Sequence, residues 1–464
     1  MFNEKEIKSK ILSNLPFVPS PEQMGLVYAL AYFVANNNTN DVFLLNGYAG
    51  TGKTSVIGAL VKSLKELKVK TVVMAPTGRA AKVASNLSSG SASTIHKRIY
   101  RGNSADPSNT TYFLAENKEK DTLFIVDEAS LITDGPTLAS SLLLQLIRYV
   151  YSAPGCRLIF LGDLAQLPPV GQTKSSAMDA ERLREVGLNP ITFSLSTPLR
   201  QSKESGILLN ATRVREFLFL NNPISEFSII RNGFPDVEIV EASEMLDFLS
   251  SSWNKVGKDE TMVITRSNFR ANNINNSIRR YLLDADGPLI SGEHLIISKN
   301  DYFWSKANKL NNFLANGESA KIVGLGNKSK KYGRWFADVD LQIPGFTEIV
   351  SVKLILRSLI AEGPSIPKDE MERFYNRVLV ESEGELSQKI KFALESPYYN
   401  ALQVKYGYCV TCHKAQGGQW KHVYIDLGGI PADADINDFY RWLYTALTRA
   451  TEKIFFINPP FKIE

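Results

Sequence analysis

The chain has 464 residues, of which 44% are hydrophobic and 22% are charged. These proportions are typical of a globular protein, and the length predicts two to four domains at ~100–200 residues each. Three cysteines argue against a disulfide framework, the N-terminal segment is not a secretory signal, and no apolar run approaches the ~20 residues of a membrane span. A net charge of +5 is too small to identify a polyanionic partner.

Short apolar segments alternate with helical patterns in the first two hundred residues. Four segments are predicted to be buried parallel strands: Val42–Asn46, Thr71–Pro76, Leu123–Glu128 and Arg157–Asp163. Between the first two, apolar residues recur at helical spacing from Ile57 to Leu64 and predict a crossover helix. This alternation predicts a doubly wound α/β domain, whose ligands bind at the carboxyl ends of the strands.

A phosphate-binding loop is expected directly after the first strand. The segment GYAGTGKT, residues 47–54, fits the pattern G-x-x-x-x-G-K-[ST] between a strand and a helix. Its glycines let backbone N–H groups point at phosphate oxygens, Lys53 would reach the β- and γ-phosphates, and Thr54 would hold Mg²⁺. The predicted nucleotide contacts in this loop are Gly47, Ala49, Gly50, Thr51, Gly52, Lys53, Thr54 and Ser55.

Polar side chains follow the next strands of this domain. Asp127 is expected to bind Mg²⁺ through water, and Glu128 to orient and deprotonate an attacking water. Gln166, in GDLAQLPPV, is placed to sense the γ-phosphate, although a polar turn stiffened by two prolines is an alternative. Hydrolysis also needs cations where charge develops, and the second half offers two arginines, although either alone also fits a surface ion pair. The predicted catalytic residues are Lys53, Glu128, Gln166, Arg200 and Arg449.

A second alternating set of strands and helices begins near residue 200. Its predicted strands are Val237–Val240, Met262–Arg266, His422–Leu427 and Lys453–Asn458, with helices after Arg266 and over residues 439–450. Residues 298–400 break this rhythm with short strand-like pieces and glycine-containing turns. We therefore expect an insertion with β-barrel character within a second α/β domain.

The segment YCVTCHKAQGGQW, residues 408–420, contains the C-x-x-C-H spacing of a c-type haem attachment site. Together with His422, its two cysteines and its histidine also form a possible set of four zinc ligands. The haem interpretation conflicts with the reducing compartment that the low cysteine content indicates, because this haem attachment belongs to exported proteins. The zinc interpretation conflicts with the adjacency of Cys412 and His413, which is poor geometry for one tetrahedral ion.

Taken in chain order, eleven segments between Pro19 and Thr451 resemble the motifs of the superfamily 1 DNA helicases, in the RecD-like branch that includes the phage Dda helicase. They are PSPEQ, GYAGTGKTS, APTGRAA, ASTIHK, VDEAS, GDLAQLPPVG, LRQS, TRSNFRANNINNSIR, NGE, TCHKAQGGQW and LYTALTRAT. The resemblance implies two RecA-like motor domains, residues 1–197 and residues 198–297 with 401–464, which share ATP in the cleft between them.

The resemblance also implies roles for individual side chains. Gln23 would hydrogen-bond the adenine edge, and Gln416 and Gly417 would lie toward the nucleotide. Arg200 and Arg449 would complete the ATP site across the cleft, whereas the two cysteines near His413 would be small core residues. The residues implied to contact DNA are Pro76, Thr77, Gly78, Arg79, Thr94, His96, Thr411, His413 and Lys414.

Two insertions are implied as well. Residues 98–121 would form a small hairpin that splits the duplex, with Phe113 at its tip, although an aromatic packed on its own domain is the alternative. Residues 298–400 would form an SH3-like barrel. Between Ser298 and Arg334 there are eight Lys or Arg against two Asp or Glu, interleaved with aromatic residues. This composition suits single-stranded DNA and equally suits a barrel with a solvated basic face.

We therefore expect an ATP- and Mg²⁺-dependent DNA helicase that moves 5′ to 3′ on single-stranded DNA and opens duplex junctions. We expect a cytoplasmic monomer, encoded by a bacterium or phage, with replication or repair partners. An RNA helicase or a protein-displacing translocase of the same fold is an alternative, because no residue reports a contact to a 2′-hydroxyl. A P-loop kinase or switch without motor function is a second alternative, but it would not need the second α/β half.

Overall fold

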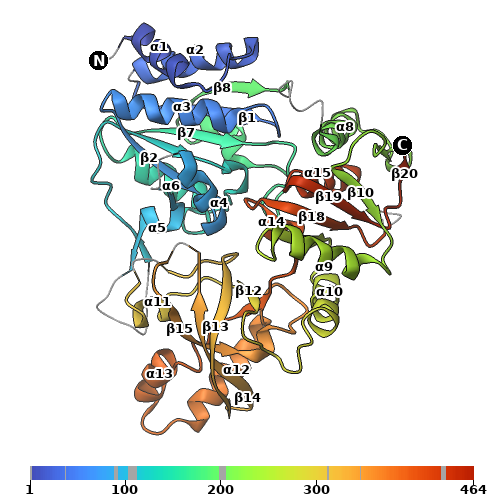
Figure 1. Cartoon of the computed structure of the whole chain (residues 1–464). Helices are drawn as coiled ribbons and strands as arrows, with labels where there is room; N and C mark the ends of the chain where they lie inside the picture. Colours follow the sequence, from blue (N-terminus) through green and yellow to red (C-terminus); the bar gives the residue numbers. More distant parts are fainter. Residues whose placement is uncertain are drawn as a thin grey trace.

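The computed structural model describes residues 3–36, 38–87, 92–102, 112–197, 205–310, 313–344, 346–429 and 435–464. Two parallel sheets lie side by side, and an antiparallel sheet lies beneath both (Figure 1). Within the described ranges, every helix is too short or too polar to cross a membrane. An α/β architecture with parallel sheets is confirmed.

The first parallel sheet has six strands in the order β3-β2-β6-β7-β1-β8. These strands are β1 (Asp41–Gly47), β2 (Lys70–Ala75), β3 (Ser93–Thr94), β6 (Thr122–Val126), β7 (Arg157–Gly162) and β8 (Asn189–Leu195), and the helices around them are α1 (Glu4–Asn14), α2 (Pro21–Ala35), α3 (Lys53–Glu66), α4 (Gly78–Ala84), α5 (Ile95–Ile99), α6 (Leu142–Tyr151) and α7 (Ala180–Glu185). Phe43 and Leu45 of β1 pack with α1, α2 and α3, whereas Val42 and Leu44 pack with α6. A core on each face makes this sheet doubly wound.

The second parallel sheet has five strands in the order β10-β19-β18-β11-β17. These strands are β10 (Val237–Val240), β11 (Thr261–Thr265), β17 (Cys409–Thr411), β18 (Trp420–Asp426) and β19 (Ala450–Ile457), and the helices are α8 (Gly206–Leu220), α9 (Met245–Val256), α10 (Asn268–Tyr281), α14 (Cys412–Ala415) and α15 (Ile436–Leu447). Val423 and Ile425 of β18 pack with α8 and α15, and Tyr424 packs with α9 and α10. A short parallel pair, β9 (Ser228–Ile229) and β20 (Lys462–Ile463), lies beside this domain.

The antiparallel sheet has the order β15-β14-β13-β12-β16. Its strands are β12 (His294–Ile297), β13 (Ser319–Lys331), β14 (Arg334–Gln342), β15 (Val350–Ile355) and β16 (Val404–Tyr406), accompanied by α11 (Phe303–Ala307), α12 (Lys368–Glu381) and α13 (Leu386–Glu395). A bridge between Leu354 and Leu402 connects β15 to the residues that lead into β16, so the two edges of the sheet approach each other. This sheet includes strands on both sides of residues 298–400; an SH3-like barrel there stays a prediction.

The predicted pin segment begins and ends in an antiparallel pair, β4 (Tyr100–Gly102) with β5 (Tyr112–Leu114). Arg101 pairs with Phe113 in this ladder. The tip between the two strands lies outside the described residues, as does Arg200.

Candidate nucleotide site and nucleic-acid interface

The phosphate-binding loop leaves the carboxyl end of β1 and enters α3, as the sequence predicts. Gly50 and Gly52 have φ angles of 74° and 80°, in the left-handed region that favours glycine. Gly52 is the N-cap of α3, so the first N–H groups of this helix point into the loop. The Lys53 ammonium group donates a hydrogen bond to the Gly162 carbonyl at 3.1 Å and therefore already lies at the end of β7.

The predicted acidic pair lies beside this lysine at the end of β6. The pKa of the Asp127 carboxyl is raised to about 6, first by burial and then by the charge of Glu128, whereas Lys53 acts in the opposite direction. Glu128 has a φ of 52°, an uncommon conformation for a residue with a side chain. Its Oε2 is buried and has no hydrogen-bond partner within the described part of the chain.

These features fit a bound Mg²⁺ ion. Positive charge beside the pair would favour the ionised carboxylates and reverse the raised pKa of Asp127. Mg²⁺ is usually held by one or two protein oxygens together with water and substrate phosphates. Thr54 and Asp127 could supply those oxygens, and Glu128 Oε2 is free to accept a hydrogen bond from an attacking water.

A tyrosine of the second domain, Tyr444, contacts the phosphate-binding loop of the first domain. The Ala49 backbone N–H donates to the Tyr444 hydroxyl at 2.9 Å, and this hydroxyl donates to Asp163 Oδ2 at 2.7 Å. Burial raises the pKa of Asp163, and burial also raises the pKa of Tyr444 well above its ordinary value. One side chain of α15 therefore contacts two segments of the first domain that face the nucleotide position.

The loop after β7 makes further contacts across the two domains. The Leu167 backbone N–H donates to the Thr445 hydroxyl at 2.9 Å, and Gln416 Nε2 donates to the Leu167 carbonyl at 2.8 Å. Arg441 Nη1 donates to the Gln166 carbonyl at 3.2 Å. Gln166 Oε1 itself is buried without a hydrogen-bond partner among the described residues, so it is available to a ligand.

Arg449 and Gln23, two other residues predicted to contact the nucleotide, form hydrogen bonds within the protein. Arg449 donates through its guanidinium to Thr445, Gly418 and Thr448, all in the second domain. Gln23 Nε2 donates to the Thr51 carbonyl at 2.9 Å. Gln23 Oε1 accepts from the Ser20 N–H at 2.9 Å, within the capping box of α2. Contacts of Arg449 and Gln23 with a nucleotide stay predictions.

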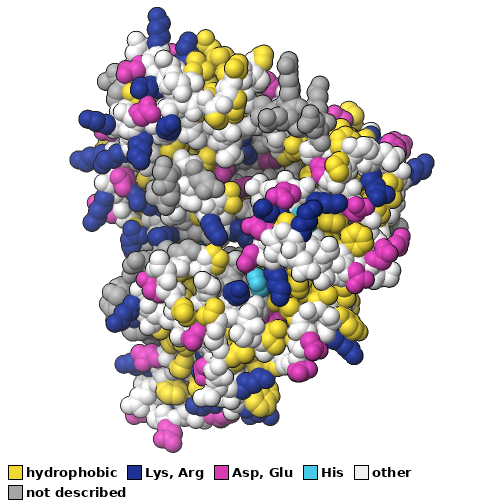
Figure 2. Space-filling model, in the orientation of Figure 1, with side chains coloured by type: hydrophobic (Ala, Val, Ile, Leu, Met, Phe, Trp, Pro, Cys, Tyr) yellow, Lys and Arg dark blue, Asp and Glu magenta, His cyan; other side chains and the backbone are white. Residues whose placement is uncertain are grey.

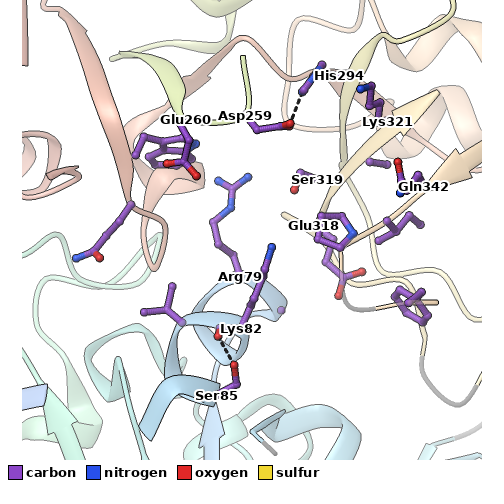
Figure 3. Close-up of a pocket in the computed structure, with 18 residues that line it drawn as sticks. Arg79, Lys82, Ser85, Asp259, Glu260, His294, Glu318, Ser319, Lys321 and Gln342 are labelled. Carbon is purple, nitrogen blue, oxygen red and sulfur yellow. Dashed lines mark hydrogen bonds and ion pairs between the residues drawn. The ribbon is translucent and has the colours of Figure 1, made fainter. Parts of the chain in front are cut away.

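A cavity of about 720 Å³ lies where both parallel-sheet domains meet the antiparallel sheet (Figure 3). The predicted DNA contacts Gly78 and Arg79 line it from the first domain. The Arg79 guanidinium lies 4.7 Å from the centre of the Trp420 ring, and burial lowers its pKa to about 10. Arg79 Nη1 has no hydrogen-bond partner in the described ranges. A guanidinium group held this way could bind a phosphate of a DNA strand by donating hydrogen bonds to it.

Glu318, at the start of β13, faces the same cavity (Figure 3). A Cβ atom added at Gly78 would lie 2.5 Å from Glu318 Oε1, so this carboxyl group lies directly against the glycine. Glu318 Oε2 accepts a hydrogen bond from the Ala315 N–H at 2.9 Å, and burial raises the pKa of Glu318 to about 7. An acidic group therefore stands where the first domain is predicted to contact DNA.

The segment T-x-H-K-A-Q-G lies directly against the first domain. Gly417 has a φ of 72°, and a Cβ atom added there would lie 2.8 Å from the Ala80 Cβ, so only glycine fits without strain. Thr411 ends β17 and is buried, whereas His413 is exposed. Burial lowers the pKa of Lys414 to about 8. Figure 2 shows Lys and Arg side chains gathered around the place where the domains meet.

The two cysteines of the C-x-x-C-H segment lie inside the second domain. Both thiols are free and buried, and burial raises the pKa of Cys412 to about 12. A thiol that resists ionisation is a poor metal ligand, because metals bind the thiolate. His422 Nδ1 lies 2.8 Å from the Ser252 hydroxyl, so its ring hydrogen-bonds within the second domain. These placements fit core residues, the role implied by the resemblance.

The predicted contacts of α5 and the pin lie at the lower edge of the first domain. Pro76 follows β2 directly, and Thr77 and Thr94 cap α4 and α5 by accepting hydrogen bonds from backbone N–H groups. The His96 ring lies 6.4 Å from the ring of Phe313, which belongs to the antiparallel-sheet domain. Phe113 is 56% exposed and lies in the β4–β5 ladder opposite Arg101, not at the tip, so its role as the pin residue stays a prediction.

Three contact residues were not expected from the sequence. Arg441, Tyr444 and Thr445 of α15 all bond to the first domain. Their spacing is i, i+3 and i+4, which places polar groups on one face of an otherwise apolar helix. That polar face is the sequence signal that could have identified them.

Comparison with known proteins follows the same division of the chain. Residues 24–207 match the model of an AAA domain, and residues 406–457 match a UvrD-like helicase C-terminal domain. A protein of Acanthamoeba polyphaga mimivirus is 23% identical, over 91% of this chain and 96% of its own length. The ATP-dependent RecD2 DNA helicase of Deinococcus radiodurans is 23% identical, over 94% of this chain and 50% of its own length.

The ATP-dependent DNA helicase dda of Enterobacteria phage T4 is 25% identical, over 55% of this chain and 56% of its own length. The chain thus spans about half of these two named helicases. Among solved structures, the Pif1 helicase from Bacteroides in complex with ADP-AlF3 and ssDNA is 16% identical, with a TM-score of 0.47 over 95% of this chain and 92% of that protein.

Proposed function

We propose that the chain is a superfamily 1 helicase that resembles Dda, and that it uses ATP and Mg²⁺ to translocate 5′ to 3′ on single-stranded DNA and to separate duplexes. The proposed motor domains are residues 1–197 and residues 198–297 with 401–464. Within them, residues 98–121 form the proposed pin and residues 298–400 the proposed SH3-like insertion. The protein would act as a monomer at duplex junctions.

The observation that carries this proposal is the seam between the two parallel-sheet domains. The phosphate-binding loop bonds to Tyr444, and the loop after β7 bonds to Thr445 and Gln416. All three partners belong to the second domain. A kinase or switch would need only the first domain, whereas a motor needs a nucleotide position that both domains share.

The side chains at this seam divide the chemistry between them. The loop N–H groups and Lys53 bind the phosphates, and Glu128 accepts the proton of the attacking water. Thr54 and Asp127 would hold Mg²⁺, which would supply positive charge beside the phosphates. Gln166 orients the attacking water or contacts the γ-phosphate through its unpartnered Oε1.

In this proposal the strand moves because the segments that contact the nucleotide are joined to the segments that contact the DNA. Leu167 accepts a hydrogen bond from Gln416, two residues beyond Lys414, which we propose to contact the strand. Gly417 lies against Ala80 at the first domain's DNA-contact segment. A change at the γ-phosphate therefore alters how the two halves of the strand-binding surface meet. The strand moves because the two domains bind and release it in turn.

A strand-separation assay tests this proposal. Duplexes with a single-stranded 5′ tail or a single-stranded 3′ tail carry a fluorophore and a quencher, and are mixed with the protein, ATP and Mg²⁺. We expect rapid separation of the 5′-tailed duplex and slow separation of the 3′-tailed one. Separation of the 3′-tailed duplex alone would reverse the proposed polarity. Separation of tailed RNA duplexes but not DNA duplexes would favour an RNA helicase.

A further inference from the structure

A groove of about 520 Å³ lies beside the turn that joins β13 to β14. Figure 1 shows this part of the antiparallel sheet extending away from the first domain. We call it the Trp335 groove. Tyr406 and Leu359 form its buried floor, and Trp335 and Ile360 form walls that are 53% and 61% exposed. Contiguous exposed apolar side chains, here an indole beside an isoleucine, are typical of a binding groove.

The rim of the Trp335 groove is positively charged. Lys328, Arg334 and Arg357 line it, and Lys330 Nζ lies 5.8 Å from the centre of the Trp335 ring. The acidic group at this rim is Glu370, which bonds to Arg334 at 2.6 Å and lies 3.3 Å from Arg357. Neither Lys328 nor Lys330 forms a salt bridge with any described residue. Lys328 and Lys330 are therefore the cations at this rim that no carboxylate of the described residues neutralises.

These cations continue toward the T-x-H-K segment of the second domain. Lys405, which precedes Tyr406 of the groove floor, is buried and donates a hydrogen bond to the Ala361 carbonyl, next to Ile360 of the groove wall, so its charge lies beneath the surface. Lys414 Nζ lies 3.5 Å from the Pro364 carbonyl, so its side chain reaches the antiparallel-sheet domain. Within the described ranges, neither Lys405 nor Lys414 has a carboxylate partner in a salt bridge. A row of positive charge thus runs from Lys414 to the groove.

We propose that the Trp335 groove is a second contact for single-stranded DNA, in which a base stacks on Trp335 while the neighbouring phosphates lie against Lys328 and Lys330. This inference rests on the proposed function, since the strand would reach the groove from Lys414. Alternating stacking platforms and cations are the general pattern of single-strand binding. An acidic peptide could also occupy the groove, but it would not require the cations to continue to Lys414, and this continuity favours DNA.

The groove lies outside the seam that binds the nucleotide. It would therefore extend the surface that contacts the strand without taking part in hydrolysis. Its contact should matter only for strands long enough to reach it. A strand of about 8 nucleotides fits within the two parallel-sheet domains, whereas one of about 20 nucleotides would extend to the groove, given typical site sizes of ~4–16 nucleotides.

The test compares binding of fluorescent oligothymidylates of about 8 and about 20 nucleotides. We expect Trp335→Ala to weaken binding of the longer strand about 5- to 100-fold, as loss of one base stack does, and to leave the shorter strand unaffected. Trp335→Phe should restore most of the affinity because it retains a ring. Phe392→Ala, which removes a 48% exposed aromatic residue from α13, is the matched control and should change neither affinity.

Salt dependence provides an independent readout. Lys328→Ala should reduce the slope of log affinity against log salt for the longer strand by about 1, because one phosphate contact is lost. Equal affinity of Trp335→Ala and the wild-type protein for the longer strand would overturn the inference. The inference would also be overturned if Trp335→Ala lost binding to an acidic peptide with a terminal aromatic residue but kept its affinity for the longer strand. Failure of the wild-type protein to bind either strand would instead contradict the proposed function.

Discussion

The backbone N–H of Ala49 donates a hydrogen bond to the hydroxyl of Tyr444 at 2.9 Å. Ala49 lies in the phosphate-binding loop of the first domain, and Tyr444 lies in α15 of the second. The same hydroxyl donates to Asp163 at 2.7 Å, so Tyr444 connects two nucleotide-facing segments to the other half of the motor. A phosphate that approaches the Ala49 N–H would compete with this hydroxyl, which ties nucleotide binding to the position of α15.

Removal of that hydroxyl should weaken the coupling between the two domains. Tyr444→Phe deletes both hydrogen bonds but keeps the buried ring, and we expect DNA-stimulated ATP hydrolysis to fall about tenfold, which corresponds to a combined loss of about 1.4 kcal/mol from the two hydrogen bonds. Tyr440→Phe is the matched control, because its hydroxyl donates to Pro223 within the second domain. Steady-state hydrolysis with saturating single-stranded DNA measures the effect, and equal rates for the two variants would contradict it.

Lys53 is expected to be required for hydrolysis but not for strand binding. Lys53→Ala removes the cation that reaches the transferred phosphate, and ATP hydrolysis should fall by ~100-fold or more. Binding of single-stranded DNA without nucleotide should change little, because Lys53 bonds to Gly162 inside the first domain. Lys62→Ala, an exposed lysine on the same helix, serves as the control. Parallel loss of hydrolysis and DNA binding would indicate unfolding instead.

The buried carboxyl of Glu318 should make stability depend on pH. Burial raises its folded pKa to about 7 from an ordinary value of 4.5, so the folded protein retains a proton that the unfolded chain releases. Stability should therefore decrease as pH rises from about 4.5 to about 7. Glu318→Gln should remove this contribution, whereas Glu372→Gln, on the exposed face of α12, should not. Urea unfolding at pH 5 and pH 8 measures the difference, and an unchanged pH dependence in Glu318→Gln would refute it.

Phe113 should act in strand separation and not in ATP hydrolysis. It lies on β5, opposite Arg101, and 56% of its surface is exposed. Phe113→Ala should slow unwinding of a tailed duplex by roughly fivefold or more, if its ring stacks on the base pair at the junction. The rate of DNA-stimulated ATP hydrolysis should remain within about twofold, because the residue lies outside the seam. Unchanged unwinding would remove Phe113 from the proposed pin.

The sequence predicted the buried parts of both parallel sheets well. Central strands such as β1 and β7 are continuous apolar runs, because they are covered on both faces. The edge strand β3 was missed because it is only two residues long, whereas β17 contains Cys409, which the resemblance implied to be a core residue of a strand. The strand β8 was also missed, since its exposed and half-buried residues do not form an apolar run.

The candidate site was predicted in part, for a physical reason. The phosphate-binding loop and the Asp127–Glu128 pair follow local rules, because backbone geometry and adjacency determine which atoms meet. The polar face of α15 is a local pattern, but it does not show which atoms it meets: the contacts of Tyr444 with Ala49 and Asp163 depend on how two domains pack. The same holds for Glu318, which meets Gly78 across two domains far apart in the sequence.

The rate of ATP hydrolysis with and without single-stranded DNA tests the central claim most directly. The seam joins the loop after β7, which carries Gln166, to a segment that we propose to contact the strand, through Leu167 and Gln416. We therefore predict that saturating oligothymidylate raises the wild-type rate at least ~10-fold, and that Tyr444→Phe loses most of this increase. An identical rate in the presence and absence of any oligonucleotide would contradict the account.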